Sequence, residues 1–350
     1  MESMFVRRDL LLDLYLVTMG LLGLFCVNAV SNHFFLYQSV FFVISLVAYF
    51  VISSFKTKTL NFFLVLLYFV TLIGLLYLFL FGSETRGSIA WINFGIINFQ
   101  PSEFAKISVI FFTSKILSSI YFFSKKFVYL GISILPILLL IFLQPDFGNF
   151  FVIIFSVSFI FFVGFLDLKR LLVLFTVFLI FSILIYSFIL KPYQKLRIDS
   201  FIFQNNVNIS SNYNLNQSKI AIGSGGIFGR GHNNNTQVML NFLPEAHTDF
   251  IFAAVSEKYG FIFSVFLSIV FLGLVLWVFY KYILNAKSAY FLYLACGVFA
   301  VFIVQVFLNL GMSVGLLPIT GLTLPFVSYG GSSLVTFYIL FAILQKTNYS

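Results

Sequence analysis

One short segment brings two acidic residues and a histidine to the point where a polar stretch meets a long apolar run. The segment spans residues 243–249 and contains Glu245, His247 and Asp249, and the apolar run begins at residue 250. A carboxylate at such a boundary is partly desolvated, which favours its use as a general base. Asp249 is therefore the leading candidate for catalysis, although an acid that caps a helix N-terminus would occupy the same place.

A second acid lies beside a lysine near the start of another apolar run. Glu103 and Lys106 are three residues apart, so they share one face of a helix that Pro101 is well placed to open. The lysine lies about one turn inside the run, where an unpaired ammonium group is costly. The two residues either neutralise each other or belong to a site that binds an anion, and we predict that they interact in the wall of a cavity. Glu257 and Lys258 are predicted to form a second buried pair.

A third acid, Asp146, lies in a turn at 144–149 that contains Pro and Gly. A structural role, in which Asp146 accepts backbone hydrogen bonds in the turn, is about as well supported as a functional one. In the functional role Asp146 would bind a cation or hold the cavity wall. The glycine-rich stretch at 223–231 has the wrong spacing for a dinucleotide fingerprint. Helix-breaking residues at 324–333 lie at membrane depth, where irregular backbone is tolerated only beside a cavity or inside protein. No organic cofactor is expected.

Membrane-spanning helices must position these residues. Of 350 residues 61% are hydrophobic and 9% are charged, whereas soluble domains carry about 25% charged residues. A crossing helix needs about 20 apolar residues, and continuous apolar runs exclude a β-barrel, whose strands alternate. The sequence predicts an all-α integral membrane protein, with residues 1–350 as a single polytopic domain. Ten spans are expected, at 10–30, 34–54, 60–81, 104–124, 127–143, 147–165, 171–190, 250–280, 288–310 and 326–344.

The Lys and Arg residues are distributed unevenly between the joints of these spans. With the N-terminus in the cytoplasm, the inner joints carry Arg7, Arg8, Lys56, Lys58, Lys125, Lys126, Lys169, Arg170, Lys281, Lys287 and Lys346. By the positive-inside rule both termini are cytoplasmic. The stretch 82–103 and the large loop at 191–249, between the seventh and eighth spans, are then extracytoplasmic. The net charge of +9 is scattered rather than gathered on one face, so no nucleic acid partner is expected.

Several motifs, in order along most of the chain, resemble those of the SEDS family of peptidoglycan polymerases. They lie at 91–95 (Trp-Ile-Asn-Phe-Gly), 99–103, 144–148, 193–198, 217–226, 243–253 and 324–333. The sequence of residues 218–224 is more similar to RodA, the elongation member, and that of residues 321–325 is more similar to FtsW. We favour the RodA type. The Asn- and Ser-rich stretch 201–216 departs from the family pattern, which leaves the geometry of the large loop open.

The resemblance implies a ten-span, inverting glycosyltransferase in the bacterial cytoplasmic membrane that polymerises lipid II on the outer face during cell elongation. It implies that Asp249 is the essential acid, that undecaprenyl-pyrophosphate is the leaving group, and that a class B penicillin-binding protein is the partner. Lys106, Lys219, Arg197 or a divalent cation such as Mg²⁺ or Mn²⁺, with Asp146 as the candidate ligand, would assist departure of the pyrophosphate. The residues predicted to bind substrate are Trp91, Glu103, Lys106, Arg197, Lys219, Glu245, His247 and Ser328.

Three other functions fit parts of the sequence. A lipid II flippase would also need an amphipathic cavity among about ten helices, but the charged residues gather on one side of the membrane. A catalytically silent scaffold for the transpeptidase would explain the apolar faces. It would not explain why six acids fall at or beyond the outer surface: Glu84, Glu103, Asp146, Asp199, Glu245 and Asp249. A division polymerase of the FtsW type differs from the favoured function in its role rather than in its chemistry.

Overall fold

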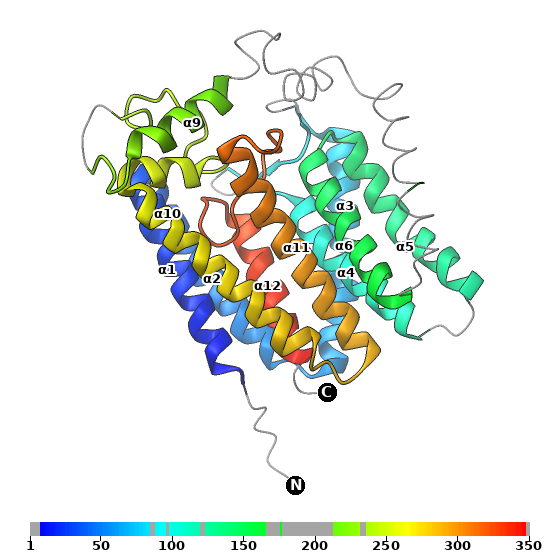
Figure 1. Ribbon diagram of the computed structural model, residues 1–350. Helices are drawn as coiled ribbons and strands as arrows, with labels where there is room; N and C mark the ends of the chain where they lie inside the picture. The colour runs from blue at the N-terminus through cyan, green and yellow to red at the C-terminus, as the bar shows by residue number, and fades with distance from the viewer. Residues whose placement is uncertain are drawn as a thin grey trace.

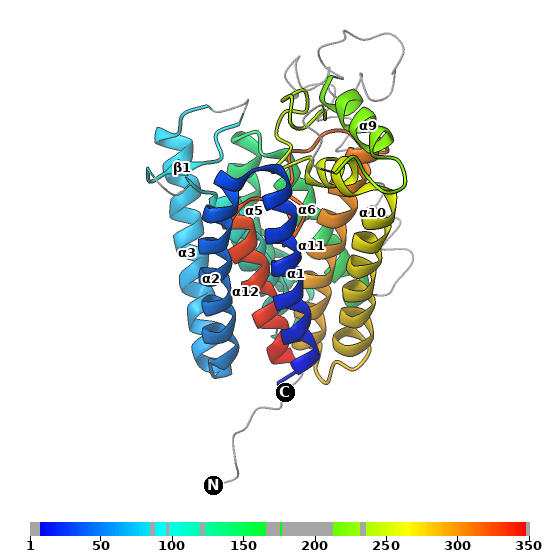
Figure 2. The same cartoon turned by 90° about the vertical axis from the view of Figure 1, so that its left-hand side faces the viewer.

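The computed structural model of the chain describes residues 8–84, 88–95, 98–119, 123–165, 176, 213–231 and 236–347. In these residues the chain forms a bundle of long helices that lie side by side (Figures 1 and 2). The helices are α1 (Leu10–Val30), α2 (Asn32–Ser54), α3 (Thr57–Phe81), α4 (Pro101–Ser119), α5 (Phe123–Leu143), α6 (Phe147–Phe165), α9 (Tyr213–Gly225), α10 (Ile251–Val278), α11 (Ala289–Val314) and α12 (Gly331–Thr347). A π-helical turn, η2 (Phe279–Ile283), continues α10, and two short strands, β1 (Ile92–Asn93) and β2 (Asn98–Phe99), pair antiparallel before α4.

The apolar runs of the sequence become the crossing helices. Among the described residues seven helices are long and apolar enough to span a membrane: α1, α2, α3, α5, α6, α10 with η2, and α11. The helix α12 is apolar but shorter. These findings confirm the predicted all-α, multi-pass membrane fold. The span predicted at 171–190 lies outside the described residues apart from residue 176. The span predicted to begin at residue 326 begins instead at Gly331, because residues 326–330 form a buried turn.

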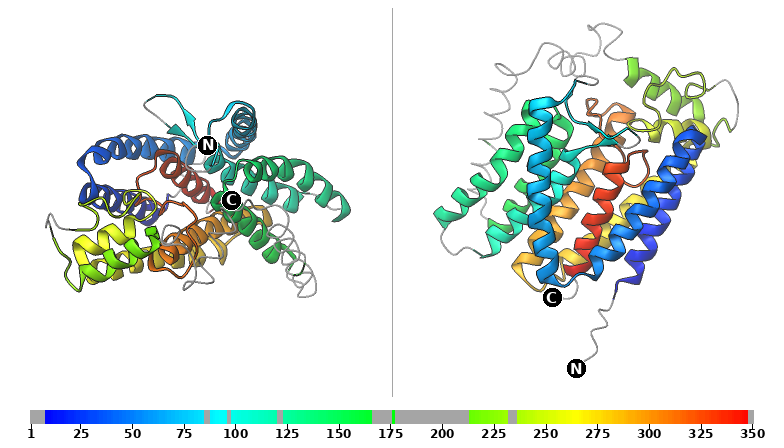
Figure 3. Two further views of the ribbon diagram at one scale, coloured as in Figure 1. Left: turned by 90° about the horizontal axis from the view of Figure 1, so that it is seen from above. Right: turned by 180° about the vertical axis from the view of Figure 1, so that it is seen from behind.

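The helix α4 lies in the interior of the bundle although it carries charged residues. Fifteen of its 19 residues are buried, and it packs against α3, α5, α6, α11 and α12. Seen from above, α12 also lies near the middle of the bundle (Figure 3). The polar side chains of α4 therefore face protein rather than lipid.

The two ends of the bundle differ. The helix α9 lies across one end, which we call the loop end (Figure 1). At the opposite end the Tyr282 hydroxyl donates to Asp9 Oδ2 at 2.8 Å, and its oxygen lies 3.1 Å from Gln345 Oε1. Lys281 Nζ also lies 2.8 Å from Asp9 Oδ2. These contacts join the start of α1, η2 and the end of α12, so the first and last described helices have their outer ends on the same side.

A glycine interrupts α10 close to the loop end. Gly260 has a φ of +82°, and a Cβ atom there would lie 2.3 Å from the backbone nitrogen of Gly229. The turn that follows α9 fits into this break, where Phe261 N donates to Gly226 O at 2.9 Å. Only glycine adopts this backbone conformation without strain while leaving room for the turn. The break thus fixes α9 to α10.

The predicted pairing of Glu257 with Lys258 is wrong. Glu257 is buried and accepts hydrogen bonds from Gln237 N at 2.7 Å, Val238 N at 3.1 Å and Ser224 Oγ at 3.2 Å. Lys258 donates instead to Ala29 O, at the end of α1, at 2.7 Å. Adjacent residues of a helix point in different directions, so each of the two finds a partner on another segment.

Candidate active site

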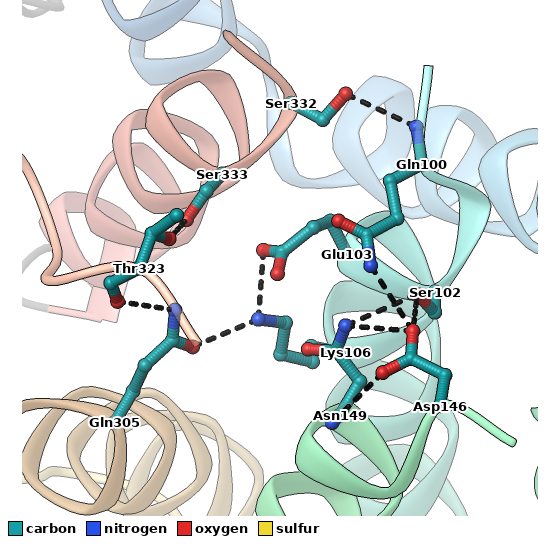
Figure 4. Close-up of polar contacts among 10 residues, drawn as sticks. All are labelled: Gln100, Ser102, Glu103, Lys106, Asp146, Asn149, Gln305, Thr323, Ser332 and Ser333. Carbon is teal, nitrogen blue, oxygen red and sulfur yellow. Dashed lines mark hydrogen bonds and ion pairs between the residues drawn. The ribbon is translucent and has the colours of Figure 1, made fainter. Parts of the chain in front are cut away.

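The predicted ion pair on α4 forms inside the protein. Lys106 Nζ lies 2.7 Å from Glu103 Oε2, with the two side chains 0% and 3% exposed. Lys106 also donates to Gln305 Oε1, on α11, at 2.8 Å (Figure 4). Its Nζ lies 5.7 Å from the centre of the Phe337 ring. A buried ammonium group is tolerated only when it is paired and hydrogen-bonded. The pair and Gln305 supply those partners.

Asp146 lies beside this pair and is surrounded by hydrogen-bond donors. Its Oδ2 accepts from Gln100 Nε2 at 3.0 Å, Ser102 Oγ at 2.6 Å and Asn149 Nδ2 at 3.0 Å, and its Oδ1 accepts from Asn149 N at 3.3 Å (Figure 4). Three of these four donors crowd Oδ2 and one reaches Oδ1, so hydrogen bonds already engage both oxygens of the carboxylate. This arrangement does not suit a divalent cation, and the described residues contain no group of three His, Cys, Asp or Glu side chains that could hold one. Asp146 instead ties α4 to α6.

The segment between α11 and α12 also contributes to the polar contacts around Lys106 and Asp146. Gln305 Nε2 donates to Thr323 O at 3.1 Å, and Thr323 Oγ1 donates to Ser333 Oγ at 2.9 Å. Ser332 Oγ accepts from Gln100 N at 3.1 Å (Figure 4). The sequence reasoning missed Gln305, although a glutamine inside an apolar run is itself a signal, because its carboxamide needs a partner.

Asp249 lies at the start of α10, as predicted, on the loop end. The backbone amides of Thr248, Asp249 and Phe250 all donate to Glu245 O, at 3.2, 3.1 and 3.2 Å. Glu245 adopts a left-handed φ of +54° to make this turn. The N-cap residue of α10 is Phe250, whose own side chain makes no cap hydrogen bond. Asp249 lies one residue before this N-cap, so catalysis and helix capping both stay predictions for its carboxylate.

The structure brings three further predicted residues to the turn that carries Asp249. Glu245 Oε2 accepts from Thr248 Oγ1 at 3.2 Å. The His247 ring stacks on Phe34 with centroids 4.0 Å apart and an angle of 8°. Ser328, which is buried, donates from Oγ to Thr248 O at 2.5 Å. Ser328 therefore supports the turn, and Glu245 and His247 are part of it.

The remaining predicted residues lie elsewhere. Lys219, on α9, packs against Gly315 at the C-terminal end of α11, where a Cβ atom would lie 2.1 Å from Lys219 Cε. A positive charge is favourable at that end of a helix. Gln305, the partner of Lys106, lies ten residues earlier on α11, which is about 15 Å of helix. Trp91 is 41% exposed beside β1, and Arg197 lies outside the described residues.

The fold is that of a multi-pass integral membrane protein. Its candidate site combines a buried ion pair on α4 with an acidic residue, Asp249, at the N-terminal end of α10 on the loop end. The chain belongs to the family of cell cycle proteins that includes FtsW, RodA and SpoVE, whose family model matches residues 10–350. This finding confirms the predicted membership in the SEDS family.

Similar proteins carry related names. The chain is 33% identical over 286 residues to the peptidoglycan glycosyltransferase MrdB of Escherichia coli strain K12, which covers 80% of this chain and 76% of that protein. It is 30% identical over 368 residues to the probable peptidoglycan glycosyltransferase FtsW of Wigglesworthia glossinidia brevipalpis, covering 97% and 93% of the two chains. A chain from the solved structure of a peptidoglycan synthase complex aligns with a TM-score of 0.82 at 26% identity, over 97% of both chains.

Proposed function

We propose that this chain polymerises lipid II into peptidoglycan glycan strands. The observation that carries the proposal is the placement of Asp249 at the N-terminal end of α10, in a turn that backbone hydrogen bonds fix. The names of the relatives from Escherichia coli and Wigglesworthia support the same activity.

The proposed reaction needs one base and one leaving group. A sugar hydroxyl of the acceptor attacks the anomeric carbon of the donor, and Asp249 takes the hydroxyl proton. The bond from that carbon to the oxygen of undecaprenyl-pyrophosphate breaks, and the carbon inverts. A single carboxylate suffices, by analogy with the base of inverting glycosidases.

Positive charge would stabilise the departing pyrophosphate. Lys219 is exposed on the loop end, whereas Lys106 is fully buried and held by Glu103 and Gln305. We therefore assign the direct contact with pyrophosphate to Lys219, together with Arg197, and propose that the buried pair holds α4 against α11. Trp91, Glu245 and His247 are the proposed contacts for the rest of the substrate.

The loop end is proposed to face the extracytoplasmic side. The basic joints between α2 and α3 and between α10 and α11 lie at the opposite end of the bundle (Figure 2). They carry Lys56, Lys58 and Lys287, and positive joints favour the cytoplasm. The outer ends of α1 and α12 share that side, so both termini are proposed to be cytoplasmic.

We further propose a role in elongation with a class B penicillin-binding protein as the partner. The sequence of residues 218–224 supports the RodA-like role. A chain similar to this one belongs to a peptidoglycan synthase complex that coordinates polymerization and crosslinking, which supports the partner. Complementation separates the roles: the chain should restore cells depleted of the elongation polymerase, and rescue of only the division polymerase would contradict this assignment.

The activity is tested with purified protein and lipid II in detergent, with and without the cognate transpeptidase. Glycan strands are expected from the wild-type chain and should be lost in Asp249→Asn. Detergent contains no bilayer to flip across, so product there also excludes a protein that is solely a flippase. Folded wild-type protein that makes no glycan with its partner present would overturn the proposal in favour of a flippase or a scaffold.

A further inference from the structure

Residues 322–330, between α11 and α12, form an irregular segment inside the protein. Leu322, Leu324, Phe326, Val327 and Ser328 are all buried in it. Buried backbone groups need hydrogen-bond partners. The segment supplies some of its own, since Val327 N and Ser328 N both donate to Leu324 O, but its other carbonyl groups need partners from elsewhere. We call residues 322–330 the connecting segment.

Three buried carboxamide side chains supply those partners. Asn309 Nδ2 donates to Leu322 O at 2.7 Å, and Gln305 Nε2 donates to Thr323 O at 3.1 Å. Gln38, on α2, donates from Nε2 to Ser328 O at 3.1 Å and accepts from Gly330 N at 3.3 Å. The exposed fractions are 0% for Asn309 and Gln305 and 1% for Gln38. The connecting segment is therefore held from both sides by α11 and α2.

The same elements hold three successive carbonyl groups of the turn that carries Asp249. His247 O accepts from Tyr329 N at 2.9 Å, and Thr248 O accepts from Ser328 Oγ at 2.5 Å. Asp249 O accepts from Asn309 Nδ2 at 2.9 Å. Asn309 thus uses one amide group to join the backbone of Asp249 to the connecting segment, while the other two bonds come from the segment itself.

We propose that Asn309, directly, and Gln38, through the connecting segment, are positioning residues that set the orientation of the Asp249 carboxylate for catalysis. The proposal rests on the proposed function. The backbone of Asp249 has a fixed carbonyl and a fixed amide, so its side chain leaves the chain in a defined direction. A shift of about 1 Å in a catalytic group can lower the rate about 100-fold.

The helix α11 also links this turn to the buried ion pair. Gln305 and Asn309 are four residues apart and so lie on the same face of α11. Gln305 accepts from Lys106 at 2.8 Å, whereas Asn309 donates to Asp249 O. One face of α11 therefore contacts both the Glu103–Lys106 pair on α4 and the backbone of Asp249 before α10.

The test compares Asn309→Ala with a matched variant, Gln345→Ala. Gln345 is also a buried carboxamide, 1% exposed, but it bonds with Tyr282 and Asp13 at the far end of the bundle. Lipid II polymerisation is measured per folded molecule, with kcat, KM and the pH profile of kcat/KM, beside thermal unfolding. In Asn309→Ala we expect kcat to fall about 100-fold with KM changed less than threefold. Gln345→Ala should lose similar stability and keep its kcat.

Gln38→Met provides a second variant if Asn309→Ala does not fold. It keeps the side-chain length but removes two bonds to the connecting segment, and we expect kcat to fall roughly tenfold. Equal kcat losses in the Asn309 and Gln345 variants, or an unchanged kcat in Gln38→Met, would overturn the proposal. If wild type polymerises and Asp249→Asn does not, such a result refutes the positioning role alone. A wild-type chain without activity refutes the proposed function instead.

Discussion

Removal of Lys106 alone should be among the most damaging changes to the stability of this protein. The pair with Glu103 has an N–O distance of 2.7 Å and is 0% and 3% exposed, so solvent does not screen it. Lys106→Met leaves a buried carboxylate without its counter-charge and leaves Gln305 Oε1 without its donor. Breaking such a buried pair costs about 3–5 kcal/mol.

Two comparisons isolate the effect of the stranded charge. The double change Glu103→Gln with Lys106→Met removes both charges, and replacement of a whole buried pair is often neutral or stabilising. Lys281→Met breaks a second ion pair, but its lysine is 30% exposed and Asp9 keeps donors from Tyr282, Trp277 and Leu12. Both should therefore cost clearly less than Lys106→Met.

The free energy of unfolding is measured on the purified variants in mixed micelles by titration with a denaturing detergent, with helicity as the signal. Lys106→Met is expected to lose at least twice the free energy that Lys281→Met loses. Similar losses in those two variants would refute the reasoning, because they would mean that burial does not decide the cost. A double variant as unstable as Lys106→Met would show that lost packing, rather than stranded charge, is responsible.

Three further outcomes are expected. Asp249→Asn should insert normally and bind lipid II while polymerisation falls by about 10²–10⁴; glycan products resolved on gels measure this, and normal polymerisation would place the base on another residue. A cysteine introduced at Leu240 should react with an impermeant reagent in intact cells and one at Asn285 should not, since the native cysteines are buried; labelling at 285 contradicts the orientation. Gly260→Ala should lower the thermal midpoint because its φ is +82° and its Cβ would lie 2.3 Å from backbone nitrogen, whereas Gly131→Ala meets its nearest atom at 3.7 Å and should not.

Much of the fold could be read from the sequence. A crossing helix requires a continuous apolar run of about 20 residues, and such runs are visible without knowledge of their neighbours. The prediction failed at residues 326–330, where apolar residues form a buried turn rather than helix. Apolar composition reports burial, and it does not distinguish a helix from an irregular segment that protein surrounds.

The sequence alone determined the two features of the site that depend on neighbours along the chain. Helical spacing predicted the contact between Glu103 and Lys106, and the boundary between polar and apolar residues singled out Asp249. The separate partners of Glu257 and Lys258 could not be read in the same way, because each partner lies on another segment. Only the tertiary structure decided what Gln38, Gln305 and Asn309 hold: a carboxamide in an apolar run needs a hydrogen-bond partner, but packing alone determines which distant backbone group provides it.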